Sequence, residues 1–247
     1  MKLLLQTTVL TFSLLVSGPA YLEGSQAFPF TSEAGIGIIY ASQPGRATLD
    51  QGEDGGNPFA SALIELPNKP SLSLDQLLDQ MVTITYQKSG GYQLPDVSGI
   101  RAASNWKIKP NQSPKKNIAL VATFSRYDAD GISWLPGAER DRIRVSNALR
   151  AAGFKVATVA NPTKGELEHL LHEMAVASKD ADAAFIYVTG HGFEDQGRVY
   201  LAPSNYHFNP RKSAVNDGAI YIGQLGSGLQ AKQANLVFFG GCRTRLL

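Results

Sequence analysis

From residue 117 onward, apolar runs of strand type alternate with amphipathic segments of helix type. Strands are expected at residues 118–124, 154–159, 181–189 and 235–239, and helices at residues 138–152, 161–174 and 222–232. Continuous apolar runs are typical of strands that are buried on both faces. Because strands separated by helices favour right-handed crossovers, the pattern predicts an α/β fold with a parallel sheet and helices on both of its faces.

The first hundred residues have a different pattern. They predict a strand at residues 36–41, helices at 57–66 and 74–86, and a short edge strand at 92–97, which contains a proline. Residues 99–116 are polar and hold two prolines, so we expect a linker there. With 43% hydrophobic and 18% charged residues, the chain of 247 residues can form one large domain or two small ones.

Charge and cysteine content exclude several classes of function. The formal net charge of +2 gives no electrostatic reason to expect a nucleic acid as the partner. A single cysteine, Cys242, excludes an intramolecular disulfide and a zinc site built from several cysteines.

The N-terminal segment has the pattern of an export signal. Residues 1–16 hold one basic residue followed by an apolar run that is too short and too interrupted to span a bilayer. Small residues at 18–20 and 25–27 suit a signal peptidase, so we expect a signal peptide within residues 1–27, cleaved near 20 or 27. The product would then be periplasmic or extracellular, with no stable membrane insertion. A lipid-retained anchor and a buried N-terminal helix are the alternatives.

Two residues with nucleophile and base chemistry follow two of the expected strands. His191 lies in TGHG directly after the strand at 181–189, and Cys242 lies in FGGCR directly after the strand at 235–239. If these strands are neighbours, they lie about 4.8 Å apart and both side chains emerge at the carboxyl edge of the sheet. A histidine there can take the thiol proton, and backbone N–H groups of Gly192 and Cys242 can stabilise an oxyanion. Taken singly, each residue also fits a structural role, as a capped strand-end histidine or a buried cysteine.

Several segments resemble one peptidase family. FIYVTGHGFEDQGRVYLAP (185–203) resembles the histidine segment of bacterial caspase-like and metacaspase-type peptidases, in which the histidine precedes the cysteine by roughly 50 residues. AERDRIRVSNALRAAGFKV (138–156) is similar to the first helix and second strand of that family, and residues 116–124 to its first strand. The resemblance implies a three-layer caspase-like sandwich with a mostly parallel six-stranded sheet.

The resemblance also implies an unusual order of parts. IIYASQPGRATLDQGEDGGNPFASALIEL (38–66) resembles the opening of the small subunit of the family, which normally follows the cysteine, and residues 74–97 resemble its later helix and closing strand. We therefore expect one circularly permuted domain over residues 28–247, with a small-subunit-like part at 36–98, a linker at 99–116 and a large-subunit-like part at 117–247. The strand at 36–41 should then pair with the strand at 235–239.

Membership of this family would make the protein a cysteine endopeptidase that forms an acyl-enzyme on Cys242, with a peptide or protein as substrate. By the same resemblance, Asp50, Asp141 and Thr189 would bind the residue before the scissile bond and would favour Arg or Lys. The alternatives are a catalytically inactive caspase-like binding module and an incomplete domain. Gly240 keeps the first of these open, because the family usually carries an acidic or Gln-type residue near that position.

No cofactor is expected. Asp50, Glu53 and Asp54 could bind Ca²⁺, but a solvated acidic turn is the simpler interpretation. His169 and His172 lie three residues apart without a third metal ligand of clear spacing, so we interpret them as a solvated helix face. The oligomeric state stays open.

Overall fold

The computed structural model describes residues 35–52, 55–69, 72–99, 116–128, 132–207 and 218–245. The expected signal peptide and most of the expected linker lie outside these ranges. No helix of the part that the structure describes has the length and apolar character needed to cross a membrane.

Six strands form the central sheet, in the order β2-β1-β9-β5-β3-β4. Their bounds are β1 Ile36–Tyr40, β2 Asp96–Gly99, β3 Asn117–Thr123, β4 Phe154–Ala160, β5 Ala183–Thr189 and β9 Ala234–Phe239. All neighbouring pairs in this sheet are parallel except β1 and β2, which are antiparallel. The expected α/β fold with a mostly parallel six-stranded sheet is confirmed.

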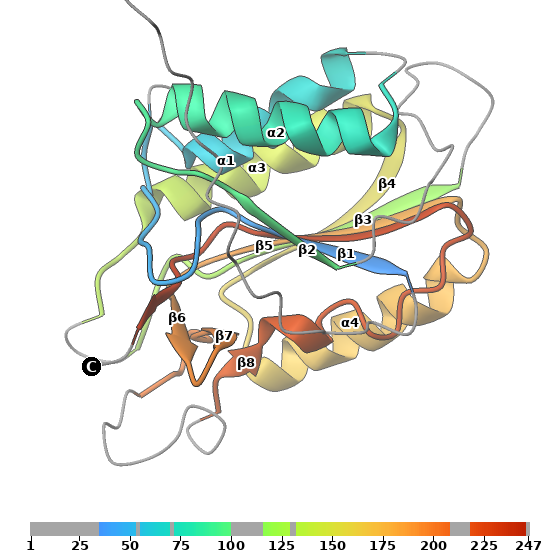
Figure 1. Cartoon of the computed structure of the whole chain (residues 1–247). Coiled ribbons are helices and arrows are strands. Elements are labelled where there is room, and N and C mark those ends of the chain that lie inside the picture. The colour runs from blue at the N-terminus through green and yellow to red at the C-terminus, as the bar shows by residue number, and fades with distance from the viewer. Residues whose placement is uncertain are drawn as a thin grey trace, which may run out of the picture. The chain divides into compact units, whose positions relative to one another are not determined.

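Helices cover both faces of this sheet, as expected. They are α1 Pro58–Glu65, α2 Leu74–Lys88, α3 Pro136–Ala151 and α4 Lys164–Ser178. Figure 1 shows α1, α2 and α3 over one face and α4 over the other. Two capping boxes start α2 and α4, at Ser73 and Thr163, and Gly153 follows α3 with a φ of 86° that favours glycine.

Side chains of each strand alternate between two hydrophobic cores. On β5, Phe185 and Tyr187 face the core under α1, α2 and α3, whereas Ile186 and Val188 face the core under α4. The first core joins residues from both halves of the chain, since Phe59 and Met81 pack in one cluster with Phe185. The two halves therefore share one hydrophobic interior.

The pairing of β1 with β9 joins the two halves within the sheet. Its register runs from Ile36 opposite Asn235 to Tyr40 opposite Phe239. The hydrogen bond from the Ala41 N–H to the Phe239 carbonyl, at 2.9 Å, continues the contact beyond the strands. The expected pairing of these two strands is confirmed.

Two expected elements differ from the structure. The edge strand begins at Asp96 rather than at residue 92, because Pro95 lacks the N–H that a strand residue donates. The helix expected at 222–232 was wrong, since only a 3₁₀ turn, Ile222–Gln224, forms there. Glycines disfavour a helix in this segment, and at Gly226 an added Cβ would lie 2.7 Å from the Ile36 side chain.

A small second sheet follows β5 and was not predicted. It has the order β10-β6-β7-β8, with β6 Gly192–Asp195, β7 Arg198–Leu201, β8 Ile220–Tyr221 and β10 Thr244–Arg245. Its strands have two to four residues each, too few for periodicity to show in the sequence. The remaining short element is a 3₁₀ turn at Leu66–Asn68.

Candidate active site

His191 and Cys242 lie at the same level of two neighbouring strands. In the large sheet Val188 is paired with Phe239, and in the small sheet Phe193 is paired in parallel with Thr244. Both pairings have the same offset along the chain, and this offset also sets His191 opposite Cys242. Because neighbouring strands lie about 4.8 Å apart, the two residues stand side by side at the carboxyl edge of the sheet.

The His191 ring is oriented by a backbone carbonyl. Its Nε2 lies 2.7 Å from the carbonyl oxygen of Ser133. A carbonyl only accepts, so Nε2 carries the proton in this contact and Nδ1 of the neutral ring keeps its lone pair. The ring therefore has a free basic nitrogen while its other nitrogen is held.

Tyr127 holds the backbone at the same residue. The His191 N–H donates to the Tyr127 hydroxyl at 2.8 Å, and that hydroxyl donates to the Phe124 carbonyl at 3.0 Å. The two rings pack with their centroids 5.0 Å apart. Burial raises the pKa of Tyr127 far above its ordinary value, so the phenol stays protonated and keeps both hydrogen bonds.

The Cys242 thiol is half-buried and contacts Thr48, from the loop after β1. The Thr48 N–H donates to Sγ at 3.3 Å, and Oγ1 of Thr48 lies 3.4 Å from Sγ. Backbone hydrogen bonds fix this loop against the residue after the cysteine: Gly45 N–H donates to the Arg243 carbonyl at 3.0 Å and Arg243 N–H to the Arg46 carbonyl at 2.9 Å. Among the described residues, no hydrogen bond joins Sγ to the His191 ring.

Gly192 lies directly against the backbone of Cys242. The His191 carbonyl accepts from the Ala202 N–H at 2.9 Å, and Gly192 is paired with Leu201 of β7. An added Cβ on Gly192 would lie 2.5 Å from the Cys242 carbonyl oxygen. Only glycine fits so close to the cysteine backbone.

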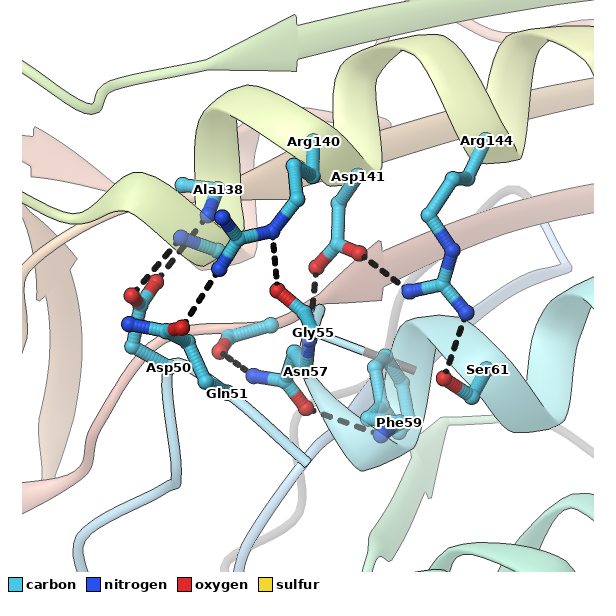
Figure 2. Close-up of polar contacts among 12 residues, drawn as sticks. Asp50, Gln51, Gly55, Asn57, Phe59, Ser61, Ala138, Arg140, Asp141 and Arg144 are labelled. Atoms are coloured by element: carbon cyan, nitrogen blue, oxygen red, sulfur yellow. Dashed lines mark hydrogen bonds and ion pairs between the residues drawn. The ribbon is translucent and has the colours of Figure 1, made fainter. Parts of the chain in front are cut away.

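Asp50 caps a helix with both of its carboxylate oxygens. Oδ2 accepts from the Gly137 N–H at 2.7 Å and Oδ1 from the Ala138 N–H at 3.0 Å, at the N-terminus of α3 (Figure 2). The helix has no side-chain cap of its own, because Leu135 stands at its N-cap position. A carboxylate is favoured there because unpaired N–H groups and the helix dipole attract negative charge.

Asp141 is buried on the same helix and has two partners of its own. Its Oδ2 accepts from the Asn57 N–H at 3.0 Å, and its Oδ1 accepts from the Arg144 guanidinium at 3.0 Å (Figure 2). Burial raises the pKa of this carboxyl to about 7, although the Asn57 N–H and Arg144 act in the opposite direction. The group therefore changes charge near neutral pH.

Thr189 ends β5 and is packed against Gly240. Its Oγ1 lies 2.7 Å from the place that a Cβ on Gly240 would occupy. The Gly240 carbonyl accepts from the Asn57 side-chain amide at 2.9 Å and from the Thr48 hydroxyl at 3.3 Å. A larger residue at position 240 would displace Thr189, so the glycine belongs to this packing.

Some of the residues predicted from the sequence come together at the strand ends, and the others have separate protein partners. The structure brings His191, Gly192 and Cys242 together at the strand ends. It places Thr189 against Gly240, Asp50 against the N-terminus of α3 and Asp141 within α3, and both carboxylates have protein partners. Five residues of this neighbourhood were missed by sequence reasoning: Thr48, Asn57, Gln93, Tyr127 and Ser133.

Only one of the missed residues had a local signal. Asn57 precedes Pro58, the pattern of an N-cap followed by proline at the first helical position, and its side chain does accept from the Phe59 N–H at 2.8 Å. Gln93 is fully buried and accepts from the Leu49 N–H at 2.9 Å, a contact between segments that no spacing rule relates.

Arg243, directly after the cysteine, is buried and pairs with acidic residues other than Asp50 and Asp141. Its guanidinium lies 2.7 Å from Asp96 of β2 and 3.6 Å from Glu194 of β6, and 4.4 Å over the ring of Tyr40. Arg243 therefore does not pair with Asp50 or Asp141, and Arg144 is the cation that pairs with Asp141.

No cluster of three or more His, Cys, Asp or Glu side chains suited to a metal occurs among the residues that the structure describes. Glu53 and Asp54, considered above for Ca²⁺, lie outside those residues. His169 lies 3.6 Å from Glu173 on an exposed face of α4.

A family model described as the caspase domain matches residues 116–246, more than half of the chain. No curated protein matches the chain significantly.

Proposed function

The chain belongs to the caspase-domain family, and on that basis we propose that it is a cysteine endopeptidase with Cys242 as the nucleophile and His191 as the general base. The observation that supports this proposal is the shared register of the two strand ends, which sets Cys242 beside His191. A thiol beside an oriented histidine is the requirement for nucleophilic catalysis by cysteine.

The proposed reaction proceeds through an acyl-enzyme. The His191 Nδ1 takes the thiol proton while Sγ attacks the carbonyl carbon of the scissile peptide bond. The resulting oxyanion accepts hydrogen bonds from the N–H groups of Gly192 and Cys242. His191 then gives its proton to the leaving amine, and a water molecule that His191 deprotonates hydrolyses the thioester.

The Ser133 carbonyl supports this cycle in both protonation states of His191. It accepts from Nε2–H when the ring is neutral, and it accepts the same hydrogen bond from the imidazolium that forms after proton transfer. A hydrogen bond to a charged donor is stronger, so the contact stabilises the ring most when it is protonated.

We propose a preference for Arg or Lys before the scissile bond, as the family resemblance implies. Asp50 at the N-terminus of α3 and Asp141 within that helix supply negative charge, whereas Arg144 supplies one opposing charge. Because Asp141 titrates near pH 7, cleavage after Arg should rise relative to cleavage after a neutral residue as the pH passes from 6 to 8.

We also propose that the domain is circularly permuted. The match to the family begins at residue 116, yet the parallel strand that lies beside β9, and the antiparallel strand beyond it, come from residues 36–99. These strands fill the place of the small-subunit strands, and α1 and α2 pack on the same core as α3. One domain over residues 28–247, with the linker between its two parts, is the arrangement that this supports.

The catalytically inactive binding module is the second candidate. It is favoured by one observation, the hydrogen bonding of Sγ to Thr48 rather than to His191. Export to the periplasm or the outside of the cell is a separate proposal, supported by the composition of residues 1–27. Accumulation of the uncleaved chain in the cytoplasm would contradict it.

A panel of fluorogenic peptides with Arg, Lys, Asp or Ala before the scissile bond tests the function. Wild type should cleave after Arg and Lys, and Cys242→Ala should have no activity while its melting temperature stays nearly unchanged. Turnover by Cys242→Ala would exclude the nucleophile. Preferential cleavage after Asp would exclude the proposed specificity, and no cleavage of any peptide or protein by wild type would favour the binding module.

A further inference from the structure

Thr48 faces the reacting sulfur with all three of its polar groups. Its N–H lies 3.3 Å, its hydroxyl 3.4 Å and its carbonyl 3.9 Å from Sγ of Cys242. No other described residue has a hydrogen bond to that sulfur. The residue lies 194 positions away in the chain, in the region that the family match does not include.

The loop that carries Thr48 is fixed on both sides. Before it, Gly45 and Arg46 form backbone hydrogen bonds with Arg243. After it, the Leu49 N–H donates to the buried Gln93 side chain, and Asp50 binds the N-terminus of α3. The residues on both sides of Thr48 therefore hold it in place against the sulfur.

The chemistry of these groups suits both states of the thiol. A hydroxyl has one proton and two acceptor lone pairs. While the Thr48 hydroxyl donates to the Gly240 carbonyl at 3.3 Å, it can accept the S–H proton. Once the sulfur has lost its proton, the hydroxyl can turn and donate to it, together with the N–H, and hydrogen bonds to an anion are the stronger kind.

We propose that Thr48 holds the Cys242 sulfur and favours its anionic form, so that the hydroxyl of Thr48 contributes to the reactivity of the nucleophile. Its contribution to turnover rests on the proposed peptidase function, whereas its effect on the thiol does not. Thr48 would be the residue through which the region of residues 36–99 acts on the reacting atom.

The rate of alkylation by iodoacetamide tests this directly, because Cys242 is the only cysteine of the chain. The full chain is compared as wild type, Thr48→Val and Thr48→Ser at pH 7 without substrate. Each rate is divided by the rate of the same variant unfolded in urea. We expect Thr48→Val to react about tenfold more slowly and Thr48→Ser to stay within about twofold of wild type, because serine keeps the hydroxyl.

Thr83→Val is the matched control, because the Thr83 hydroxyl donates to the Asp79 carbonyl on the exposed side of α2, away from the sulfur. Its alkylation rate should equal that of wild type. With a cleaved peptide, Thr48→Val should lower kcat more than it changes KM. A Thr48→Val rate equal to or above that of wild type would overturn the proposal, as would a Thr48→Ser rate as low as that of Thr48→Val.

Together, the alkylation and cleavage measurements separate the role of Thr48 from the peptidase function. Slow alkylation of Thr48→Val in a protein that cleaves no peptide supports the role of Thr48 on the sulfur and contradicts the peptidase function. Normal alkylation of Thr48→Val in an active peptidase contradicts the role of Thr48 and leaves the peptidase function standing.

Discussion

The region of residues 116–245 and the region of residues 36–99 contribute different kinds of group to one site. The first carries Cys242, His191 and Gly192, the groups that would react with a substrate, at the ends of strands. The second carries Thr48, Asp50 and Asn57, whose contacts hold the sulfur, the start of α3 and the Gly240 carbonyl.

This difference explains why the proposed circular permutation would leave the site intact. The reacting groups depend on the register of adjacent strands, which one region sets by itself. The supporting groups depend on hydrogen bonds between the regions, and these require that β1 pairs with β9, not that the regions follow one another in a given order.

His191→Ala should give the largest effect. Loss of the general base should lower kcat by about 10²–10⁴-fold and leave the melting temperature nearly unchanged, because the ring is partly exposed and lies outside both cores. His169→Ala, at an exposed histidine of α4, is the control and should have wild-type kinetics. Equal kinetics for the two variants would contradict the role of His191.

Arg243→Met should lower the free energy of unfolding by about 3–5 kcal/mol, because it leaves the buried Glu194 and the half-buried Asp96 without their cation. The arginine joins β2, through Asp96, to β6, through Glu194. Arg245→Met, two residues later and exposed, should change the free energy by less than about 0.5 kcal/mol. Urea unfolding measures both, and an equally stable Arg243→Met would show that this cluster does not hold the regions together.

Asp141 should make stability depend on pH in a stated direction. Its pKa is about 7 in the folded protein and near 3.8 when unfolded, so the folded state keeps a proton that the unfolded state loses. Its contribution is complete below about pH 4 and is lost as the pH rises through 7. The free energy of unfolding of wild type, relative to Asp141→Asn, should fall by up to about 1.4 kcal/mol per pH unit between these limits.

Parallel curves for wild type and Asp141→Asn between pH 4 and pH 8 would contradict the raised pKa of Asp141. A relative stability that rises with pH would mean that Arg144 dominates over burial and holds the carboxyl ionised throughout this range.

Asp50→Asn should have the smallest effect. It removes the charge that caps α3 and should cost about 0.5–2 kcal/mol of stability, measured by urea unfolding. Asp180→Asn, at an exposed turn after α4, is the control and should be neutral. If Asp50→Asn keeps wild-type stability but loses cleavage after Arg, Asp50 serves the substrate and not the helix.

The sequence predicted the fold well where strands are long and buried. The strands β3, β5 and β9 can be recognised from their own residues alone, because both faces of each strand are apolar. The short strands β6, β8 and β10 and the glycine-containing turn after β8 could not be predicted, because their conformation is decided by packing and not by periodicity.

The candidate site divides in the same way. His191, Gly192 and Cys242 were visible because each stands next to a strand that the sequence shows. Thr48 and Tyr127 could not be identified from the sequence, because they contribute through contacts with residues that lie 194 and 64 positions away. Asp50 was identified by resemblance, but its contacts with the N-terminus of α3 came only from the structure.

The most direct test of the account is to find where an active-site reagent binds. The chain is treated with a peptidyl chloromethylketone that ends in arginine, and the modified peptide is identified by mass spectrometry. The account predicts one adduct per chain, on Cys242, with no adduct on Cys242→Ala and labelling slowed at least about 100-fold in His191→Ala. An adduct on another residue, or labelling of His191→Ala as fast as wild type, would contradict it.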